Sequence, residues 1–156
     1  MLFLDSSALV KLYLAEDGTS TMRGIIHRRG GSLFVSDFIA LEVLTAIRVA
    51  LRKETAAVYA TALTQFRIDF PGLFNLVDVD AVTRRLACDL TTRSRTTRAR
   101  SMDLLHLAAA LRLQARRTLS PVTMVTSDQD LADLSKQHGL RTFDPSREPL
   151  AALPRA

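Results

Sequence analysis

Short apolar runs alternate with longer stretches of helical periodicity along the chain. Each run has the length of a buried strand, and the stretches between them repeat apolar positions every three to four residues, as amphipathic helices do. The pattern predicts strands at residues 1–5, 33–35, 73–77, 122–126 and 140–143. It predicts helices at about 7–14, 19–29, 37–51, 55–68, 80–92, 102–117 and 128–138. This alternation predicts an α/β fold with a short, mainly parallel central sheet and helices on both faces.

Polar residues at the starts of these helices are predicted to cap them. Ser6 or Ser7 would cap the first helix, Ser36 the third and Ser101 the sixth, since a hydroxyl oxygen accepts a bond from a free amide of the first turn. The fourth helix is expected to stop at Pro71, because proline interrupts helical hydrogen bonding.

The length of 156 residues suits one domain with a sizeable core. We expect this domain to span residues 1–143 and the proline-containing tail, 144–156, to be extended or mobile. No apolar run approaches the roughly 18 residues needed to cross a membrane, and the N-terminus lacks the basic start of a signal peptide. The single cysteine, Cys88, excludes an intrachain disulfide framework and fits a cytoplasmic location.

The chain is basic, with a formal net charge of +5, and arginine supplies most of the positive charge: 18 Arg against 3 Lys. Guanidinium groups bind phosphates bidentately, which favours a nucleic-acid partner, although an arginine-rich genome would give the same composition. The segment 93–100, RSRTTRAR, has no apolar face and is predicted to be an exposed basic loop. Its candidates for binding a nucleic-acid backbone are Arg93, Arg95, Arg98 and Arg100. A purely solvated loop, or one that contacts a protein partner, is the alternative.

Two acids directly follow predicted buried strands. Asp5 ends the first strand, and Asp128 stands just beyond the strand that ends at Thr126. The carboxyl ends of strands are where open α/β sheets place their ligands. Each acid, and Asp130 two residues later, could instead serve only to cap or to complement a helix N-terminus.

Two further acids lie on predicted helices. Glu42 has apolar or small neighbours one turn away, and a carboxylate that faces a core is costly unless it is paired or binds a metal. The alternative is a glutamate at the rim that reaches solvent or an arginine. Asp103 lies in a first helical turn, where an acid is favourable by about 0.3–1 kcal/mol. His106, one turn later, is expected to be an interior histidine that holds a hydrogen bond rather than a ligand.

Together these acids indicate a metal site. The strand ends of a parallel sheet share one edge, so the carboxylates of Asp5, Glu42, Asp103 and Asp128 would converge there. Oxygen ligands without Cys or His are typical of Mg²⁺ or Mn²⁺. One cysteine and three scattered histidines cannot build a zinc site.

The order of these motifs resembles the PIN-domain ribonucleases, and in particular the VapC-type toxins of type II toxin–antitoxin systems. The resemblance rests on a strand ending in Asp5-Ser6-Ser7, then SDFIALEVLTAI, SMDLLHLAAAL and VTSDQDL, and it spans residues 1 to about 143. It implies a three-layer α/β/α sandwich and Mg²⁺- or Mn²⁺-dependent cleavage of RNA. It also implies a homodimer and a VapB-type antitoxin as partner.

The family's four acids fall on the four carboxylates named above. Its hydroxyl position after the first acid falls on Ser6 or Ser7, its threonine before the fourth acid on Thr126, and a more variable extra acid on Asp130. Asp5 and Asp103 would then hold the metal, with Glu42 bound directly or through water and Asp128 completing the pocket. Water as nucleophile would leave 3′-hydroxyl and 5′-phosphate ends.

Three other classes share some of these features. A haloacid-dehalogenase-like phosphatase needs a second Asp two residues after the first, where this chain has Ser7. A receiver-type module needs a buried lysine at a late strand end, and the three lysines all lie on predicted helices. A non-catalytic RNA- or protein-binding module would keep the basic surface without needing four acids.

Overall fold

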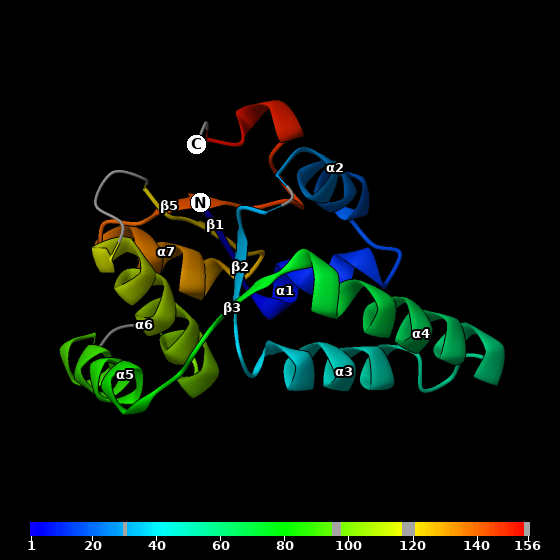
Figure 1. Ribbon diagram of the computed structural model, residues 1–156, viewed down its shortest axis with the longest axis horizontal. Helices are drawn as coiled ribbons and strands as arrows, with labels where there is room; N and C mark the ends of the chain where they lie inside the picture. The colour runs from blue at the N-terminus through cyan, green and yellow to red at the C-terminus, as the bar shows by residue number, and fades with distance from the viewer. Residues whose placement is uncertain (30, 95–97, 117–120, 155–156) are drawn as a thin grey trace.

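Five short parallel strands form one sheet at the centre of the molecule (Figure 1). The computed structural model describes residues 1–29, 31–94, 98–116 and 121–154. The strands are β1 (Leu2–Leu4), β2 (Leu33–Ser36), β3 (Asn75–Val77), β4 (Thr123–Val125) and β5 (Arg141–Phe143). Their order in the sheet is β3-β2-β1-β4-β5, and every neighbouring pair is parallel.

Helices cover both faces of this sheet. They are α1 (Ser6–Leu9), α2 (Thr19–Arg29), α3 (Ile39–Ala50), α4 (Ala56–Leu73), α5 (Ala81–Arg93), α6 (Ser101–Arg116) and α7 (Gln129–Gln137), with 3₁₀ turns η1 (Val10–Leu12) and η2 (Leu150–Ala152). In Figure 1, α1 to α4 lie on one side of the sheet and α5 to α7 on the other. The three-layer α/β/α sandwich with a parallel sheet is therefore confirmed.

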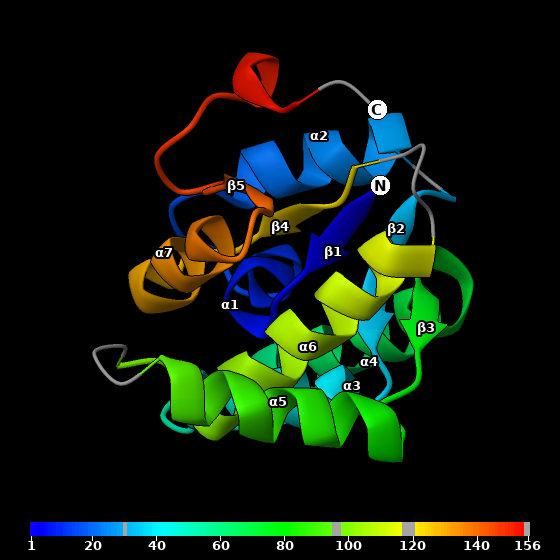
Figure 2. The ribbon, with the colours of Figure 1, turned by 90° about the vertical axis from the view of Figure 1, so that its left-hand side faces the viewer.

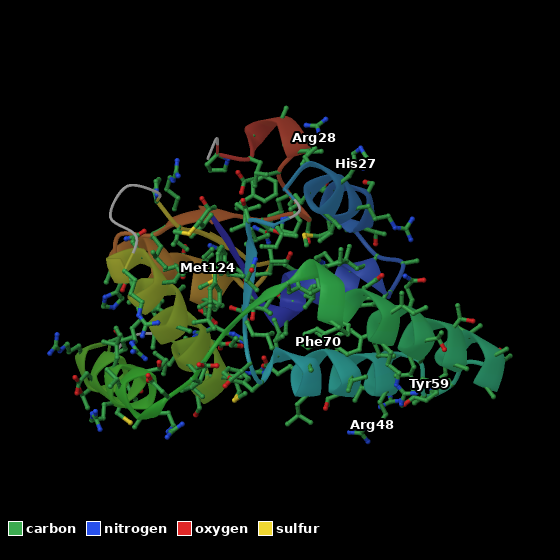
Figure 3. All side chains as sticks on the ribbon, in the orientation of Figure 1. His27, Arg28, Arg48, Tyr59, Phe70 and Met124 are labelled. Carbon is green, nitrogen blue, oxygen red and sulfur yellow. The ribbon has the colours of Figure 1, made fainter. Side chains whose placement is uncertain are left out.

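The alternation of side chains along the strands divides the core into two clusters. Leu2 and Leu4 of β1 pack with α1 to α4, whereas Phe3 packs with α5 to α7. The same alternation sends Met124 of β4 to the second cluster and Val125 to the first; Figure 3 labels Met124 within the interior. A strand buried on both faces must be apolar throughout, which explains the uninterrupted apolar runs in the sequence.

Several element boundaries differ from the predicted ones. Asp5, not Ser6 or Ser7, is the N-cap of α1, and this helix ends at Leu9 before a 3₁₀ turn. Ser36 ends β2 instead of capping α3, whose N-cap is Phe38 without a side-chain bond. Helix α4 continues past Pro71, because a proline in the final turn removes few hydrogen bonds.

Helices α3 and α4 form a hairpin that projects from the sheet (Figure 1), and in Figure 2 this hairpin lies behind α5 and α6. Figure 3 labels Tyr59 and Phe70 on α4, and Arg48 points outward from α3. No helix in the described part of the chain has the length and apolar character to cross a membrane.

The described part of the tail packs onto the domain, in contrast to the extended or mobile segment that the sequence predicts. Leu153 is buried in the cluster of α1 to α4, and the space above Gly24 of α2 is filled by Leu150. A Cβ at Gly24 would lie 2.5 Å from the Leu150 side chain. Glycine therefore allows the tail to approach α2 closely.

The strand order reverses direction at β1. The chain moves outward from β1 to β2 and β3, and then returns to place β4 on the other side of β1. Ligands of open α/β sheets bind in the crevice beyond the carboxyl ends of strands at such a switch point. Asp5 and Thr126, which follow β1 and β4, lie at this point.

Candidate functional site at the carboxyl edge of the sheet

Asp5 is the most enclosed acid of this edge, with 2% of its surface exposed. Its Oδ2 accepts hydrogen bonds from the Ser7 hydroxyl at 2.6 Å, the Thr126 hydroxyl at 3.0 Å and the Ser7 amide at 3.2 Å. Its Oδ1 accepts a longer bond of 3.4 Å from Ser6. The carboxylate is therefore both the cap of α1 and a side chain fixed in one orientation.

A network of hydroxyls joins the ends of β1 and β4. Ser7 Oγ lies 3.2 Å from Thr126 Oγ1 and accepts a bond of 2.9 Å from the Ser127 amide. Thr126 Oγ1 also accepts a bond of 3.0 Å from the Asp128 amide. The hydroxyls of Ser7 and Thr126 therefore both bond to Asp5, and Ser7 makes closer contacts with it than Ser6 does.

Glu42 reaches the same edge from α3 and bonds to a histidine. Its Oε2 accepts a bond of 2.6 Å from Nε2 of His106, and 19% of its side chain is exposed. The same Nε2 lies 3.6 Å from Asp5 Oδ1. His106 thus stands between the strand-end acid and the helix acid. The Glu42 carboxylate is thus paired, and its partner is a histidine instead of the arginine that the sequence allowed.

Asp103 sits at the start of α6, where its Oδ2 accepts a bond of 2.6 Å from the Arg100 amide. Burial raises the pKa of the Asp103 carboxyl, and the Arg100 bond opposes this. The negative charges of Asp5 and Asp128 raise the pKa further, while His106 lowers it. Asp5 and Asp128 therefore lie near enough to Asp103 for their charges to act on its carboxyl group.

Asp128 is the N-cap of α7, and its Oδ1 accepts a bond of 3.0 Å from the Leu131 amide. Asp130 is exposed in the first turn of the same helix. Asp128 therefore does cap a helix, as the sequence allowed, and it also lies near enough to Asp103 for its charge to raise the pKa of that carboxyl. Asp130 makes no described contact with the other acids.

The donor chemistry of the edge fits a hard divalent cation. Carboxylates that repel one another favour a bound cation, and oxygen donors suit Mg²⁺ or Mn²⁺. In the part of the chain that the structure describes, however, no three acidic, imidazole or thiol groups are close enough to hold a metal ion as they stand. A cation would have to draw the carboxylates closer together.

The basic segment borders this edge. Arg93 ends α5, and Arg98 and Arg100 precede α6; all three are exposed. Arg95 lies outside the described residues. The bond between the Arg100 amide and Asp103 connects this segment directly to the acids.

Sequence reasoning missed Ser36. Its side chain is fully buried, and its hydroxyl lies 3.0 Å from Nδ1 of His106. The residue follows a predicted strand next to β1, so the rule that parallel strand ends share an edge could have placed it near the site. The expectation that His106 is interior and hydrogen-bonded agrees with this arrangement.

Known structures share this fold at low sequence identity. FitAcB from Neisseria gonorrhoeae is 12% identical, with a TM-score of 0.72 over 95% of this chain and 100% of that one. VapC20 of Mycobacterium tuberculosis, described as a sarcin-ricin loop cleaving toxin, is 14% identical with a TM-score of 0.64, over 90% and 96% of the two chains. VapBC2 of Rickettsia felis, bound to a promoter DNA fragment, is 14% identical with a TM-score of 0.63, over 92% of this chain and 98% of that one.

Sequence comparison is decisive at the level of the family. No curated protein matches the chain significantly. The family model described as the PIN domain matches residues 2–137, which include all four acids. With its parallel sheet and its acids at the carboxyl edge, the chain therefore belongs to the PIN-domain family.

Proposed function

We propose that this protein is a divalent-metal-dependent endoribonuclease and the toxin of a VapBC-type toxin–antitoxin pair. The observation that supports the proposal is the placement of Asp5 and Asp128 directly after the two central strands β1 and β4, at the switch point of the sheet. Burial raises the pKa of Asp103, and the charges of Asp5 and Asp128 raise it further, so the three acids lie near enough to one another to interact.

The similar structures support this proposal through their fold. VapC20 is described as a toxin that cleaves the sarcin-ricin loop. FitAB and VapBC2 are described as bound to DNA fragments. We infer that this chain likewise acts on RNA and pairs with a VapB-type antitoxin in the cytoplasm, and that it forms a homodimer.

The residues that would hold Mg²⁺ or Mn²⁺ are Asp5 and Asp103, with Glu42 bound directly or through water and Asp128 completing the site. A bound divalent ion lowers the pKa of a coordinated water and so supplies a hydroxide nucleophile. The chain's own contribution is orientation. Ser7 and Thr126 hold the Asp5 carboxylate through bonds of 2.6 and 3.0 Å.

Arg93, Arg98 and Arg100 are proposed to contact the RNA backbone, together with Arg95. Arg93, Arg98 and Arg100 are exposed, and Arg100 adjoins Asp103, which suits phosphate contacts that position the strand without reading its sequence. Such contacts make the affinity for RNA fall as salt rises. Contact with the antitoxin is the alternative role of this segment.

The test is to map cleavage ends in total RNA with Mg²⁺ or with EDTA, using protein freed of any antitoxin. We expect cuts with 3′-hydroxyl and 5′-phosphate ends that disappear with EDTA. Asp5→Asn keeps the capping oxygen but removes the charge, and it should lower cleavage at least about a hundredfold. Full activity in Asp5→Asn, or cleavage that persists in EDTA, contradicts the proposal.

A non-catalytic RNA- or protein-binding module is the second candidate. It is favoured by one observation, namely that no ready-made metal-binding group exists among the described residues. RNA binding without Mg²⁺-dependent cleavage in the same assay would identify this function.

A further inference from the structure

His106 is fully buried, yet both of its ring nitrogens have polar partners. Nδ1 lies 3.0 Å from the Ser36 hydroxyl, and Nε2 lies 2.6 Å from Glu42 Oε2. A chain of hydrogen bonds therefore runs from the end of β2, through α6, to α3. The carboxylate of Glu42 is its only partly exposed member.

Aromatic packing fixes the plane of this imidazole. The Phe38 ring lies with its centroid 4.8 Å away, tilted by 36°, and the Phe3 ring contacts it edge-on at 6.3 Å. These contacts leave the imidazole little freedom to rotate. The direction in which Nε2 points is consequently set by β1, β2 and the start of α3.

The direction of the bonds follows from the chemistry of the groups. An ionised carboxylate can only accept, so Nε2 donates to Glu42. The Ser36 hydroxyl can donate to a bare Nδ1 or accept from a protonated one. The chain of bonds therefore holds Glu42 in either protonation state of the ring.

We propose that Ser36 and His106 are positioning residues that hold the Glu42 carboxylate beside Asp5, and thereby set the affinity of this edge for a divalent cation. A free glutamate side chain on α3 would sample many rotamers, and a cation would have to immobilise it. The buried ring does this in advance. The expected effect of these residues on RNA cleavage rests on the proposed function, whereas their expected effect on Mn²⁺ binding does not.

Two substitutions of His106 separate positioning from simple core packing. In His106→Gln, the side-chain amide nitrogen can replace Nε2 of the histidine and still donate to Glu42. In Asn, the shorter amide can replace Nδ1 and bond to Ser36, but it cannot reach Glu42. We expect His106→Asn to weaken Mn²⁺ binding, measured by electron paramagnetic resonance, about tenfold or more. His106→Gln should stay within about threefold of the unsubstituted protein.

Ser36 has a matched control in Ser135. Both side chains are fully buried, but the Ser135 hydroxyl has no hydrogen-bond partner among the described residues. We expect Ser36→Ala to weaken Mn²⁺ binding about three- to tenfold. Ser135→Ala should leave both Mn²⁺ binding and RNA cleavage unchanged.

Each outcome bears on the inference. Thermal melting of all four variants identifies any loss of fold. Equal Mn²⁺ affinity in His106→Asn and His106→Gln, with both folded, would overturn the positioning role. If the unsubstituted protein binds Mn²⁺ but cuts no RNA, the proposed function fails while the Mn²⁺ comparison still decides the inference. If cleavage occurs, kcat should fall more than KM rises in His106→Asn.

Discussion

Single side chains at this edge serve two purposes at once. Asp5 caps α1 and Asp128 caps α7, and the negative charge of each also raises the pKa of Asp103. A helix N-terminus attracts negative charge, so it stabilises a carboxylate that mutual repulsion would otherwise disfavour. The capping interpretation and the metal-site interpretation of these acids are therefore compatible.

Asp103→Asn is expected to stabilise the metal-free protein at neutral pH. The pKa of Asp103 is raised in the folded state, so above the carboxyl's ordinary pKa the charged form destabilises the fold relative to a neutral amide. Asparagine can still accept the bond from the Arg100 amide. Melting experiments should show a Tm rise of about 2–4 °C for each kcal/mol relieved.

The same experiment at low pH provides the control. Below the ordinary pKa of aspartate both chains carry a neutral group at this position, so the difference in Tm should vanish. A variant that is less stable than the unsubstituted protein at pH 7.5 would show that burial and the neighbouring charges do not disfavour the ionised Asp103 carboxylate in the folded protein. RNA cleavage should be lost in this variant at any pH.

The sequence drew attention to the four acids and to the hydroxyls of Ser7 and Thr126 that bond to Asp5, but not to Ser36. Acids after apolar runs stand out because charge is costly in a core. Ser36 carries no such signal, since serine is common at strand ends and helix starts alike. Its partner His106 is 70 residues away in the sequence, and only the fold brings the two together.

At the scale of elements, α5 and α6 are joined at the end remote from the basic segment. Asp80, the N-cap of α5, and Thr83 both bond to Arg112 of α6. The Thr83 amide and the Arg112 guanidinium lower the pKa of Asp80. This junction joins the start of α5 to the second half of α6.

Asp80→Ala should lower the Tm of the protein and increase amide exchange in the first turn of α5. The substitution removes a cap and frees Arg112 from its ion pair. Because the pKa of Asp80 is lowered on folding, its stabilisation is present above the ordinary pKa of aspartate. It is lost as the pH falls through the folded-state value.

A pH series of melting temperatures checks this. The difference in Tm between Asp80→Ala and the unsubstituted protein should become smaller as the pH is lowered. Asp89 is also exposed and, among the residues that the structure describes, neither caps a helix nor pairs with an arginine, so Asp89→Ala supplies the control substitution. A gap that is constant with pH would contradict the role of the carboxylate charge.

The elements themselves were largely predictable, and their ends were not. Apolar periodicity placed all five strands and seven helices, because burial dictates it. The end of α4 depended on how the helix tolerates Pro71 in its last turn. The start of α3 depended on an N-cap residue, Phe38, that makes no side-chain hydrogen bond. Such ends are decided by a few local hydrogen bonds, which leave little trace in a pattern of hydrophobicity.

At the scale of the whole molecule, the described part of the tail packs against α2 and adds one leucine to the core on that side of the sheet. Leu150 packs over Gly24, and Leu153 joins the buried cluster of that face. The tail lies outside the residues matched by the family model, which end at 137. Its packing therefore could not follow from the family resemblance, and scattered prolines gave the opposite expectation.

Leu153→Ala is expected to destabilise the protein by about 2 kcal/mol or more, because a buried leucine loses most of its apolar contact. Chemical unfolding would measure the loss. Ala151→Ser, at an exposed position of the same 3₁₀ turn, is the control and should change stability little. An unfolding free energy that is unaffected by Leu153→Ala would show that the tail does not pack in solution.

The bond between the Arg100 amide and Asp103 has a thermodynamic consequence. The Asp103 carboxylate both accepts the bond from the basic segment and is a candidate ligand of a cation. If cation binding changes the Arg100 bond, then the binding of a cation and the binding of a partner to the basic segment share one free energy of coupling. Whatever factor the cation imposes on the affinity of the basic segment for its partner, that partner must impose on the affinity for the cation.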